Sequence, residues 1–198
     1  MGLVQSLVSC QPPTFKIVMM GMYMVGKTTI LYRLKDNKTS SLKDTPYTNP
    51  SLGFNVETIK VNKSLHLYIW DVSSLSAITK IRYQIFPGCR GIIYVLESTI
   101  LEDSEKLTET REDLLSIVKD AELDGQPLLI LVNKMDMDKS SNIIDRITTY
   151  FNFNEMIKNG RAWSIFPITA TTGQGLNEAI HWLDNQLTNS INGTKSNH

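Results

Sequence analysis

One segment near the start of the chain restricts the possible folds more than any other. Residues 21–28 read GMYMVGKT and match the pattern GxxxxGK[ST]. An apolar run of strand length precedes this segment and a helical pattern follows it, which is the context that a phosphate-binding loop requires. The alternative is a glycine turn between strand and helix with an exposed lysine, and the strand-loop-helix context favours the phosphate loop over it. The sequence therefore predicts a strand, a phosphate loop and a helix in that order.

In such a loop, backbone N–H groups and the amino end of the helix face the phosphates. Lys27 adds a positive charge at the β- and γ-phosphates, and Thr28 offers its hydroxyl to Mg²⁺. The bulky Met22, Tyr23 and Met24 are compatible with this role when their side chains point outward, because the backbone makes the contacts. We expect these residues of the segment to contact a nucleotide: Gly21, Met24, Val25, Gly26, Lys27, Thr28 and Thr29.

Apolar segments of strand length alternate with segments of helical period along the chain. Predicted strands cover residues 15–20, 54–61, 64–70, 91–97, 127–133 and 163–169; predicted helices cover residues 27–34, 102–121, 142–151 and 176–187, with a short irregular helix at 78–84. This order predicts an α/β fold with a mostly parallel six-stranded sheet and helices on both faces. We expect the second and third strands to form a hairpin that turns at residues 62–63.

Composition limits the number of domains and the partners. With 198 residues, 41% of them hydrophobic, the chain is long enough for one domain with a real core. We predict a terminal segment at residues 1–13, a folded domain at 14–188 and a disordered polar tail at 189–198. Twenty basic and twenty acidic residues leave no net charge, which argues against nucleic-acid binding. Cys10 and Cys89 predict reduced thiols, and no apolar run reaches the roughly 20 residues that span a bilayer.

A second motif follows the fifth predicted strand, where residues 133–136 read NKMD. NKxD at a strand end is the guanine-specific signature of GTPases. The Asp136 carboxylate can accept hydrogen bonds from both the N1–H and the exocyclic amine of guanine, whereas adenine offers no such pair of donors. Lys134 can lay its methylene stem along the base or ribose, and Asn133 can tie this loop to the phosphate loop. In isolation the same residues would be a polar turn.

Two further sites follow predicted strands. Asp71 ends the third strand, where a P-loop protein places the carboxylate that holds Mg²⁺ through water. Thr169, Ala170 and Thr171 follow the last strand, where GTPases place a loop whose backbone N–H contacts the guanine carbonyl oxygen. Three motifs in this order favour a guanine-nucleotide site.

The chain resembles the ADP-ribosylation factor and ADP-ribosylation-factor-like branch of small GTPases over residues 15–187. Residues 50–58, PSLGFNVET, are similar to the PTIGFNVET switch I of that branch, and residues 70–72, WDV, to the start of its WDVGGQ switch II. Of the aromatic cluster near the switches, Phe54 and Trp70 are present and Ile85 stands at the third position. The resemblance implies the P-loop small GTPase fold, a GTP or GDP ligand and Mg²⁺.

Two departures from that branch concern the switches. Ser51 stands where switch I supplies a threonine to Mg²⁺, so the metal ligands implied by the resemblance are Thr28, Ser51 and Asp71. Ser73, Ser74 and Leu75 stand where switch II has Gly-Gly-Gln. In the branch, the second glycine brings its N–H to the γ-phosphate and the glutamine orients the attacking water. We expect Ser74 to contact the nucleotide with a backbone geometry that its side chain limits. Leu75 cannot orient water, so no catalytic residue is intact.

The chain begins MGLVQS, which fits the myristoylation pattern MGxxx[ST] with Gly2 as acceptor. Leu3, Val4, Leu7 and Val8 recur on one face of a short predicted helix. An acyl chain and an apolar stripe together give the two signals that stable membrane binding requires. The alternative is an unmodified, frayed terminus.

These observations support three hypotheses. The leading one is a monomeric GTP-binding switch, cytoplasmic and peripheral on the cytosolic face of membranes, with Golgi or endosomal membranes as candidates. It acts in vesicle traffic through exchange factors and effectors, with weak hydrolysis. Leu75 in part favours a second hypothesis, a GTP-binding scaffold that does not hydrolyse. NKMD argues against the third, a P-loop kinase acting on a small substrate.

Overall fold

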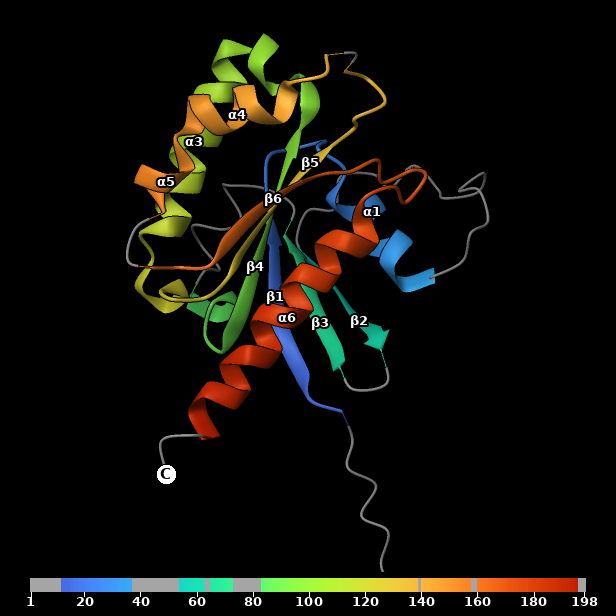
Figure 1. Ribbon diagram of the computed structural model, residues 1–198, viewed down its shortest axis with the longest axis vertical. Helices are drawn as coiled ribbons and strands as arrows, with labels where there is room; N and C mark the ends of the chain where they lie inside the picture. Colours follow the sequence, from blue (N-terminus) through green and yellow to red (C-terminus); the bar gives the residue numbers. More distant parts are fainter. Residues whose placement is uncertain are drawn as a thin grey trace, which may run out of the picture.

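The computed structural model describes residues 12–36, 54–62, 65–72, 83–138, 140–157 and 160–195. These residues form a six-stranded sheet with the strand order β2-β3-β1-β4-β5-β6 (Figure 1). The strand bounds are β1 (Thr14–Met20), β2 (Phe54–Asn62), β3 (Leu65–Val72), β4 (Cys89–Glu97), β5 (Leu128–Asn133) and β6 (Trp163–Pro167). All six predicted strands are therefore present, each with its ends shifted by a few residues at most.

Only one neighbouring pair in the sheet is antiparallel. Strand β2 runs antiparallel to β3, with Phe54 opposite Val72 and Asn62 opposite Leu65, which confirms the predicted pairing of these two strands. The four other pairs, β1 with β3, β1 with β4, β4 with β5 and β5 with β6, are parallel. Because parallel strands end at the same edge, the residues that follow β1, β3, β4, β5 and β6 meet at one edge of the sheet.

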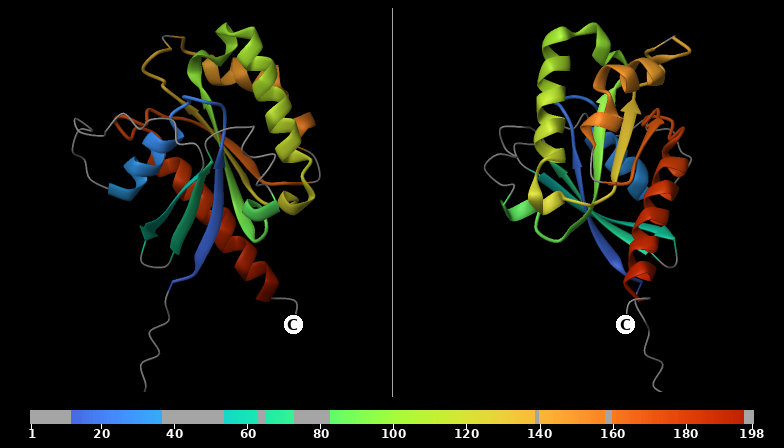
Figure 2. Two further views of the ribbon diagram at one scale, coloured as in Figure 1. Left: turned by 180° about the vertical axis from the view of Figure 1, so that it is seen from behind. Right: turned by 60° about the vertical axis from the view of Figure 1, so that its left-hand side comes forward.

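Helices cover both faces of the sheet, as the sequence predicts (Figure 2). Their bounds are α1 (Lys27–Asp36), α3 (Ser104–Val118), α4 (Ile143–Phe151), α5 (Phe153–Met156) and α6 (Leu176–Lys195). The buried residues of α1 and α6 belong to one hydrophobic cluster, and those of α3 and α4 belong to another. In the right-hand view of Figure 2, the lime α3 and the red α6 lie on opposite sides of the strands.

Side chains that alternate between the two faces of the central strands contribute to both hydrophobic clusters. In β1, Ile17 and Met19 face the cluster of α1 and α6, while Val18 and Met20 face the cluster of α3 and α4. All six residues of β5 are buried. A strand covered on both faces favours apolar side chains on both sides, which explains why its first five residues, 128–132, are an apolar run rather than an alternating pattern.

The carboxyl-terminal helix is longer than predicted. Helix α6 continues to Lys195, whereas the sequence predicts a helical end at residue 187 and a disordered tail from residue 189. Beyond Leu187, the last residue of α6 in the described hydrophobic clusters, the sequence is mostly polar, which is why it predicts a disordered tail. A helix needs only its own backbone hydrogen bonds to continue, and Arg90 of β4 donates to the Ser190 hydroxyl at 3.3 Å beside this part of α6.

Three other differences are local. The predicted helix 102–121 is a helix at 104–118 flanked by 3₁₀ turns, η1 (Ser98–Glu102) and η2 (Ala121–Leu123). The four-residue α5 was not predicted, and residues 83–85 are the described helical part of the predicted helix at 78–84. The terminal segment 1–11 and the hairpin turn at residue 63 lie outside the described residues. None of the described helices is sufficiently long and apolar to cross a bilayer.

Candidate nucleotide-binding site

The phosphate loop between β1 and α1 depends on two glycines with positive φ. Gly21 has φ +140° and a Cβ there would lie 2.3 Å from the Val95 carbonyl oxygen; Gly26 has φ +96° and a Cβ there would lie 2.4 Å from Asn133 Nδ2. Each glycine thus allows the loop to approach a neighbouring strand end closely. A positive φ and the lack of space for a Cβ atom therefore require glycine at both of these positions of the motif.

The loop keeps the bulky side chains of Tyr23 and Met24 on the outside. Tyr23 is 52% exposed and Met24 66% exposed, and Met24 adopts φ +60°. The prediction that these side chains point outward is confirmed for Tyr23 and Met24, whereas Met22 is half-buried and packs against the cluster of α1 and α6. Val25, in contrast, is buried in the cluster of α1 and α6, which fixes the carboxyl end of the loop to the core.

Lys27 begins α1 and is buried. Its amine donates to the carbonyl oxygens of Gly21 at 2.9 Å and Met22 at 2.8 Å, so the lysine lies across the inside of its own loop. Burial lowers the pKa of the Lys27 amine, although the charges of Asp71 and Asp113 act in the opposite direction. A buried ammonium is stabilised by anionic ligands, which is the electrostatic condition for phosphate binding at a helix amino end.

The Asp71 carboxylate faces Thr28 across the two strand ends. The Thr28 hydroxyl donates to Asp71 Oδ2 at 2.7 Å, while Oδ1 is buried without a hydrogen-bond partner among the described residues. Burial raises the pKa of the Asp71 carboxyl, against the lowering effects of the Thr28 hydrogen bond and the Lys27 charge. A hydroxyl and a carboxylate with a free buried oxygen are the hard ligands that Mg²⁺ prefers, so this pair fits a magnesium site.

On the base side, Asn133 joins three segments. Its Nδ2 donates to the Val25 carbonyl at 2.8 Å, and its Oδ1 accepts from the backbone N–H of Ala170 at 2.9 Å. The Asn133 side chain is buried, and Asn133 is the last residue of β5. The predicted tie between the base loop and the phosphate loop is therefore present, and Asn133 holds the loop after β6 as well.

Lys134 lies beside residues that the sequence did not indicate. Its amine is 2.6 Å from Glu97 Oε2, and the other oxygen of Glu97 pairs with Lys106. The Ser98 hydroxyl donates to the Lys134 carbonyl at 2.7 Å. Glu97 is the last residue of β4 and Ser98 begins η1, at the same edge of the sheet as the motifs. Neither residue belongs to a sequence motif, and only their position at this edge of the sheet could have indicated that they contact Lys134.

Arg33 of α1 is the second contribution that the sequence did not indicate. Its Nε donates to the Ala170 carbonyl at 3.2 Å, and Nη2 donates to the Thr171 carbonyl. The loop is also held internally, because Thr169 pairs with Gln174 in an isolated β-bridge. The loop after β6 is thus supported by α1 on one side and by Asn133 on the other.

The remaining predicted residues divide into two groups. Thr29 is half-buried in the first turn of α1, and Asp136 and Thr171 are exposed in the loops after β5 and β6. Gly2, Ser51, Ser74 and Leu75 lie outside the described residues, so their predicted roles stay predictions. The structure thus brings the phosphate-loop, Asp71, NKMD and Thr169–Thr171 predictions together at one edge of the sheet.

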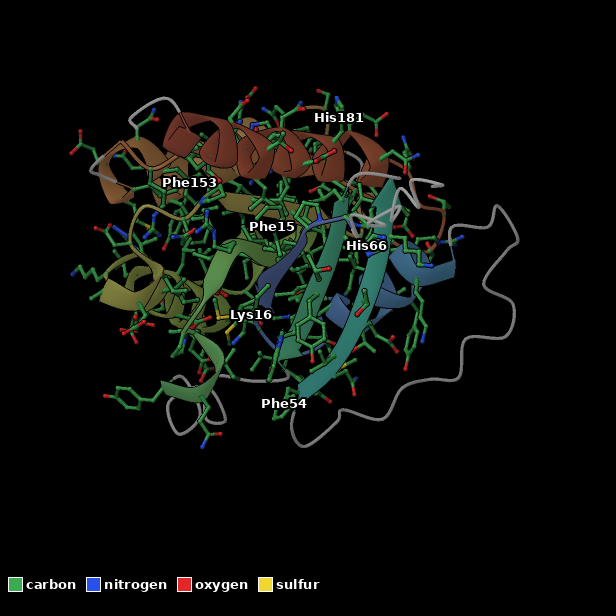
Figure 3. The ribbon with its side chains drawn as sticks, turned by 90° about the horizontal axis from the view of Figure 1, so that it is seen from below. Phe15, Lys16, Phe54, His66, Phe153 and His181 are labelled. Carbon is green, nitrogen blue, oxygen red and sulfur yellow. The ribbon has the colours of Figure 1, made fainter. Side chains whose placement is uncertain are left out.

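The predicted aromatic cluster is also present in part. Phe54 stacks on Trp70 with ring centroids 5.0 Å apart, and the Lys16 amine lies 4.7 Å from the centre of the Trp70 ring. Figure 3 shows Lys16 and Phe54 on the side of the sheet away from α6. Ile85, at the third position, is buried. A cavity of about 330 Å³ lies elsewhere, between α1, β2 and α6, and none of the nucleotide-loop residues lines it.

A comparison of the chain with known protein families agrees with this arrangement of loops. The model of the ADP-ribosylation factor family matches residues 3–187, nearly the whole chain. The chain belongs to the ADP-ribosylation factor family. This protein is therefore a GTP-binding small GTPase.

A solved structure gives the same fold for this GTPase. The small GTPase Arl6 BBS3 from Trypanosoma brucei, with the bound nucleotide analogue GppNp, is similar with a TM-score of 0.72. The alignment covers 89% of this chain and 99% of that chain at 20% sequence identity. At this identity the likeness shows the fold alone.

Proposed function

We propose that this protein is a GTP-dependent regulatory switch at the cytosolic face of membranes, acting in intracellular traffic, and that it hydrolyses GTP very slowly. The observation that carries the proposal is a contrast within the chain. Lys27 and Asn133, which we expect to bind nucleotide, are buried and hydrogen-bonded to the phosphate loop, whereas residues 73–75 read Ser-Ser-Leu where the family has Gly-Gly-Gln. Binding and hydrolysis are thus separable in this protein.

Mg²⁺ is part of the proposal. Thr28 and Asp71 would hold it, with Ser51 as a further ligand from switch I. The bound ion supplies positive charge at the phosphates, which the single Lys27 ammonium cannot provide alone. The support is Asp71 Oδ1, which is buried without a hydrogen-bond partner in the part of the chain that the structure describes, while Oδ2 accepts from the Thr28 hydroxyl.

Slow hydrolysis follows from the side chain of Leu75. A leucine has no group that can accept from or donate to water, so the attacking water is not oriented. A well-studied small GTPase with an intact glutamine hydrolyses at roughly 10⁻⁴ per second unaided and about 10⁵-fold faster with its activating protein. Little intrinsic activity is available to lose, so we expect the deficit mainly in the response to an activating protein.

The test is single-turnover hydrolysis of preloaded GTP. Wild type is compared with the triple variant Ser73→Gly/Ser74→Gly/Leu75→Gln, with and without an activating protein of this family. We expect the variant to respond to the activating protein at least about 100-fold more strongly than wild type. An equal response of the two proteins would show that Leu75 does not limit hydrolysis.

The membrane part rests on the amino-terminal sequence. Gly2 in MGLVQS and the apolar stripe of Leu3, Val4, Leu7 and Val8 provide an acyl chain and a helix face, each weak alone. We expect Gly2→Ala to move the protein from the membrane to the cytosolic fraction. A membrane fraction equal to that of wild type would remove the lipid anchor from the proposal.

The second candidate function is a GTP-binding scaffold whose state depends only on nucleotide exchange. Leu75 favours it specifically, since complete loss of hydrolysis leaves exchange as the one route between states. The nucleotide content of purified protein separates the two. A mixture of GDP and GTP that shifts to GDP with time supports the switch, and GTP that persists supports the scaffold.

A further inference from the structure

The end of β4 contacts the base-recognition lysine at two points. Glu97 Oε2 lies 2.6 Å from Lys134 Nζ, and the next residue, Ser98, donates its hydroxyl to the Lys134 carbonyl at 2.7 Å. Lys134 is therefore held by its side chain and by its backbone from one dipeptide. Such double contact fixes both the position of the Cα atom and the direction of the side chain.

The charges around Glu97 match this arrangement. Its side chain is 10% exposed and lies between the amines of Lys106 on α3 and Lys134 after β5. Burial by itself would raise the pKa of Glu97, but the hydrogen bonds and charges of the two lysines outweigh it, and the pKa is lowered. The carboxylate is thus charged at neutral pH and available to hold Lys134.

The backbone of Lys134 also requires support. Lys134 has φ +64°, a left-handed conformation that costs free energy for a residue other than glycine. The Ser98 hydroxyl is fully buried, and the Lys134 carbonyl that accepts from it also accepts from the N–H of Met137 at 2.9 Å. These two hydrogen bonds favour the turn that carries Asp136 to the guanine edge.

We propose that Glu97, assisted by Ser98, is a positioning residue for the guanine nucleotide and acts through Lys134. A free lysine side chain has many rotamers, and ordering it on ligand binding weakens affinity. In this protein the carboxylate orders the lysine before the nucleotide arrives. Lys106 balances the charge, so that the negative Glu97 does not repel the nucleotide phosphates. The proposal rests on guanine-nucleotide binding, and not on hydrolysis or membrane attachment.

The alternative is that Glu97 only stabilises the fold by joining β4, α3 and the base loop. The two roles differ in one respect. A positioning role requires the Lys134 ammonium, whereas a purely structural role persists through Lys106 when Lys134 is changed. A double-mutant cycle measures that difference.

The experiment measures dissociation of a fluorescent GDP analogue from the full chain, using Glu97→Gln, Lys134→Met and the double variant. Glu97→Gln keeps the size of the side chain, and Lys134→Met keeps most of its apolar stem. We expect Glu97→Gln to accelerate dissociation about tenfold in wild type and less than about twofold in the Lys134→Met background. Equal acceleration in both backgrounds, or none in wild type, would overturn the proposal.

Two further variants make the result unambiguous. Glu57→Gln is the matched control, because Glu57 forms an ion pair with Lys35 at 2.7 Å outside the nucleotide loops, and we expect it to leave dissociation unchanged. If Glu97→Gln does not fold, Glu97→Asp keeps the charge and shortens the reach, with an expected acceleration of about threefold that again needs Lys134. An acceleration by Glu97→Asp that is independent of Lys134 would also contradict the proposal.

The failure of this proposal is distinguishable from failure of guanine binding itself. The GDP analogue is displaced by unlabelled GTP in one arm and by ATP in another. Wild type that shows no preference for GTP contradicts the nucleotide assignment, whereas an intact preference with no effect of Glu97→Gln contradicts only the role of Glu97.

Discussion

The two halves of the nucleotide site differ in how their polar groups are satisfied. On the base side, Asn133 bridges two loops, and Arg33 and Glu97 hold the neighbouring segments through hydrogen bonds within the protein. On the phosphate side, Asp71 keeps one buried oxygen without a partner among the described residues, and burial opposes the charges of both Lys27 and Asp71. The base side is organised by the chain itself, whereas the phosphate side is completed by charged ligands.

This difference has a thermodynamic consequence. Preorganised donors and acceptors lower the entropic cost of binding and provide discrimination between bases. Buried charges instead make affinity depend on the phosphates and the cation that compensate them. Changes on the base side should therefore alter selectivity or dissociation rate, and changes on the phosphate side should alter the dependence on Mg²⁺ and pH.

The largest expected effect is on base selectivity. Asp136→Ala removes two hydrogen bonds between a carboxylate and guanine, and each such bond contributes about 1.5–3 kcal/mol. We expect the preference for GTP over ATP to fall by about 10²- to 10⁴-fold in competition titrations. Asp138→Ala, two residues further along the chain, is the control and should keep the preference. Equal selectivity of wild type and Asp136→Ala would mean that the base is read elsewhere.

The next effect sharpens the phosphate side. Asp71→Asn should reduce the Mg²⁺-dependent gain in nucleotide affinity by about 10- to 100-fold, the range for removal of a group that holds a metal through its outer shell. The melting temperature of the nucleotide-free Asp71→Asn protein should rise, because burying an uncharged amide costs less free energy than burying a charged carboxylate. This cost of burying the charge is what raises the pKa of Asp71. Calorimetry with and without Mg²⁺ measures both quantities.

The sign of the pH dependence follows from the same group. A raised pKa means that folded Asp71 binds its proton more readily than the unfolded chain does, so its contribution to stability is lost as pH rises through that raised pKa. Without ligand, the free energy of unfolding of wild type should therefore fall relative to that of Asp71→Asn as the pH rises from the ordinary pKa of an aspartate to the raised pKa of folded Asp71. Magnesium binding should show the opposite trend and weaken as pH falls, because a protonated carboxyl is a poor ligand. Parallel curves for the two proteins would contradict this account.

Residues that form a motif were predictable on both sides of the site, whereas the residues that support the motifs from other elements were not. The phosphate loop was predictable because its residues are consecutive and the glycines have no alternative at φ +140° and +96°. Glu97 and Arg33 were not predictable in the same way, since they contact Lys134 and Ala170 at separations of 37 and 137 residues. Such contacts are created by the strand order, and no local pattern records them. The extended α6 was missed because residues 188–195 are mostly polar, with Ile191 as the one large apolar residue, so composition favoured a disordered tail.

A smaller effect is expected at the residue that joins the two sides. Asn133→Ala leaves the Val25 carbonyl and the Ala170 N–H without their partner, which should lower the free energy of unfolding by about 2–5 kcal/mol. We expect nucleotide affinity to fall about tenfold as the loops lose their relative positions. Asn133→Asp separates the two hydrogen bonds, because the carboxylate still accepts from Ala170 but cannot donate to Val25. An Asp variant as stable as wild type would show that the bond to the phosphate loop contributes nothing.

The smallest expected effect concerns Arg33, which supports the loop after β6 from outside the site. Its Nε and Nη2 donate to the carbonyls of Ala170 and Thr171, a forked arrangement that a lysine amine cannot reproduce. Arg33→Lys keeps the charge and removes one of the two hydrogen bonds, and the loop is still held by Asn133. We therefore expect GDP dissociation to accelerate only about threefold, with base selectivity unchanged.

Arg90→Lys is the matched control for this variant, because Arg90 donates to the Ser190 hydroxyl of α6 and lies outside the nucleotide loops. Stopped-flow measurement of GDP dissociation resolves a threefold change between the two variants. If Arg33→Lys alters selectivity as strongly as Asp136→Ala, the loop after β6 is not preorganised by several independent contacts, and the contrast between the two sides of the site is wrong. If it changes nothing while Asn133→Ala has its full effect, Asn133 alone organises the base side.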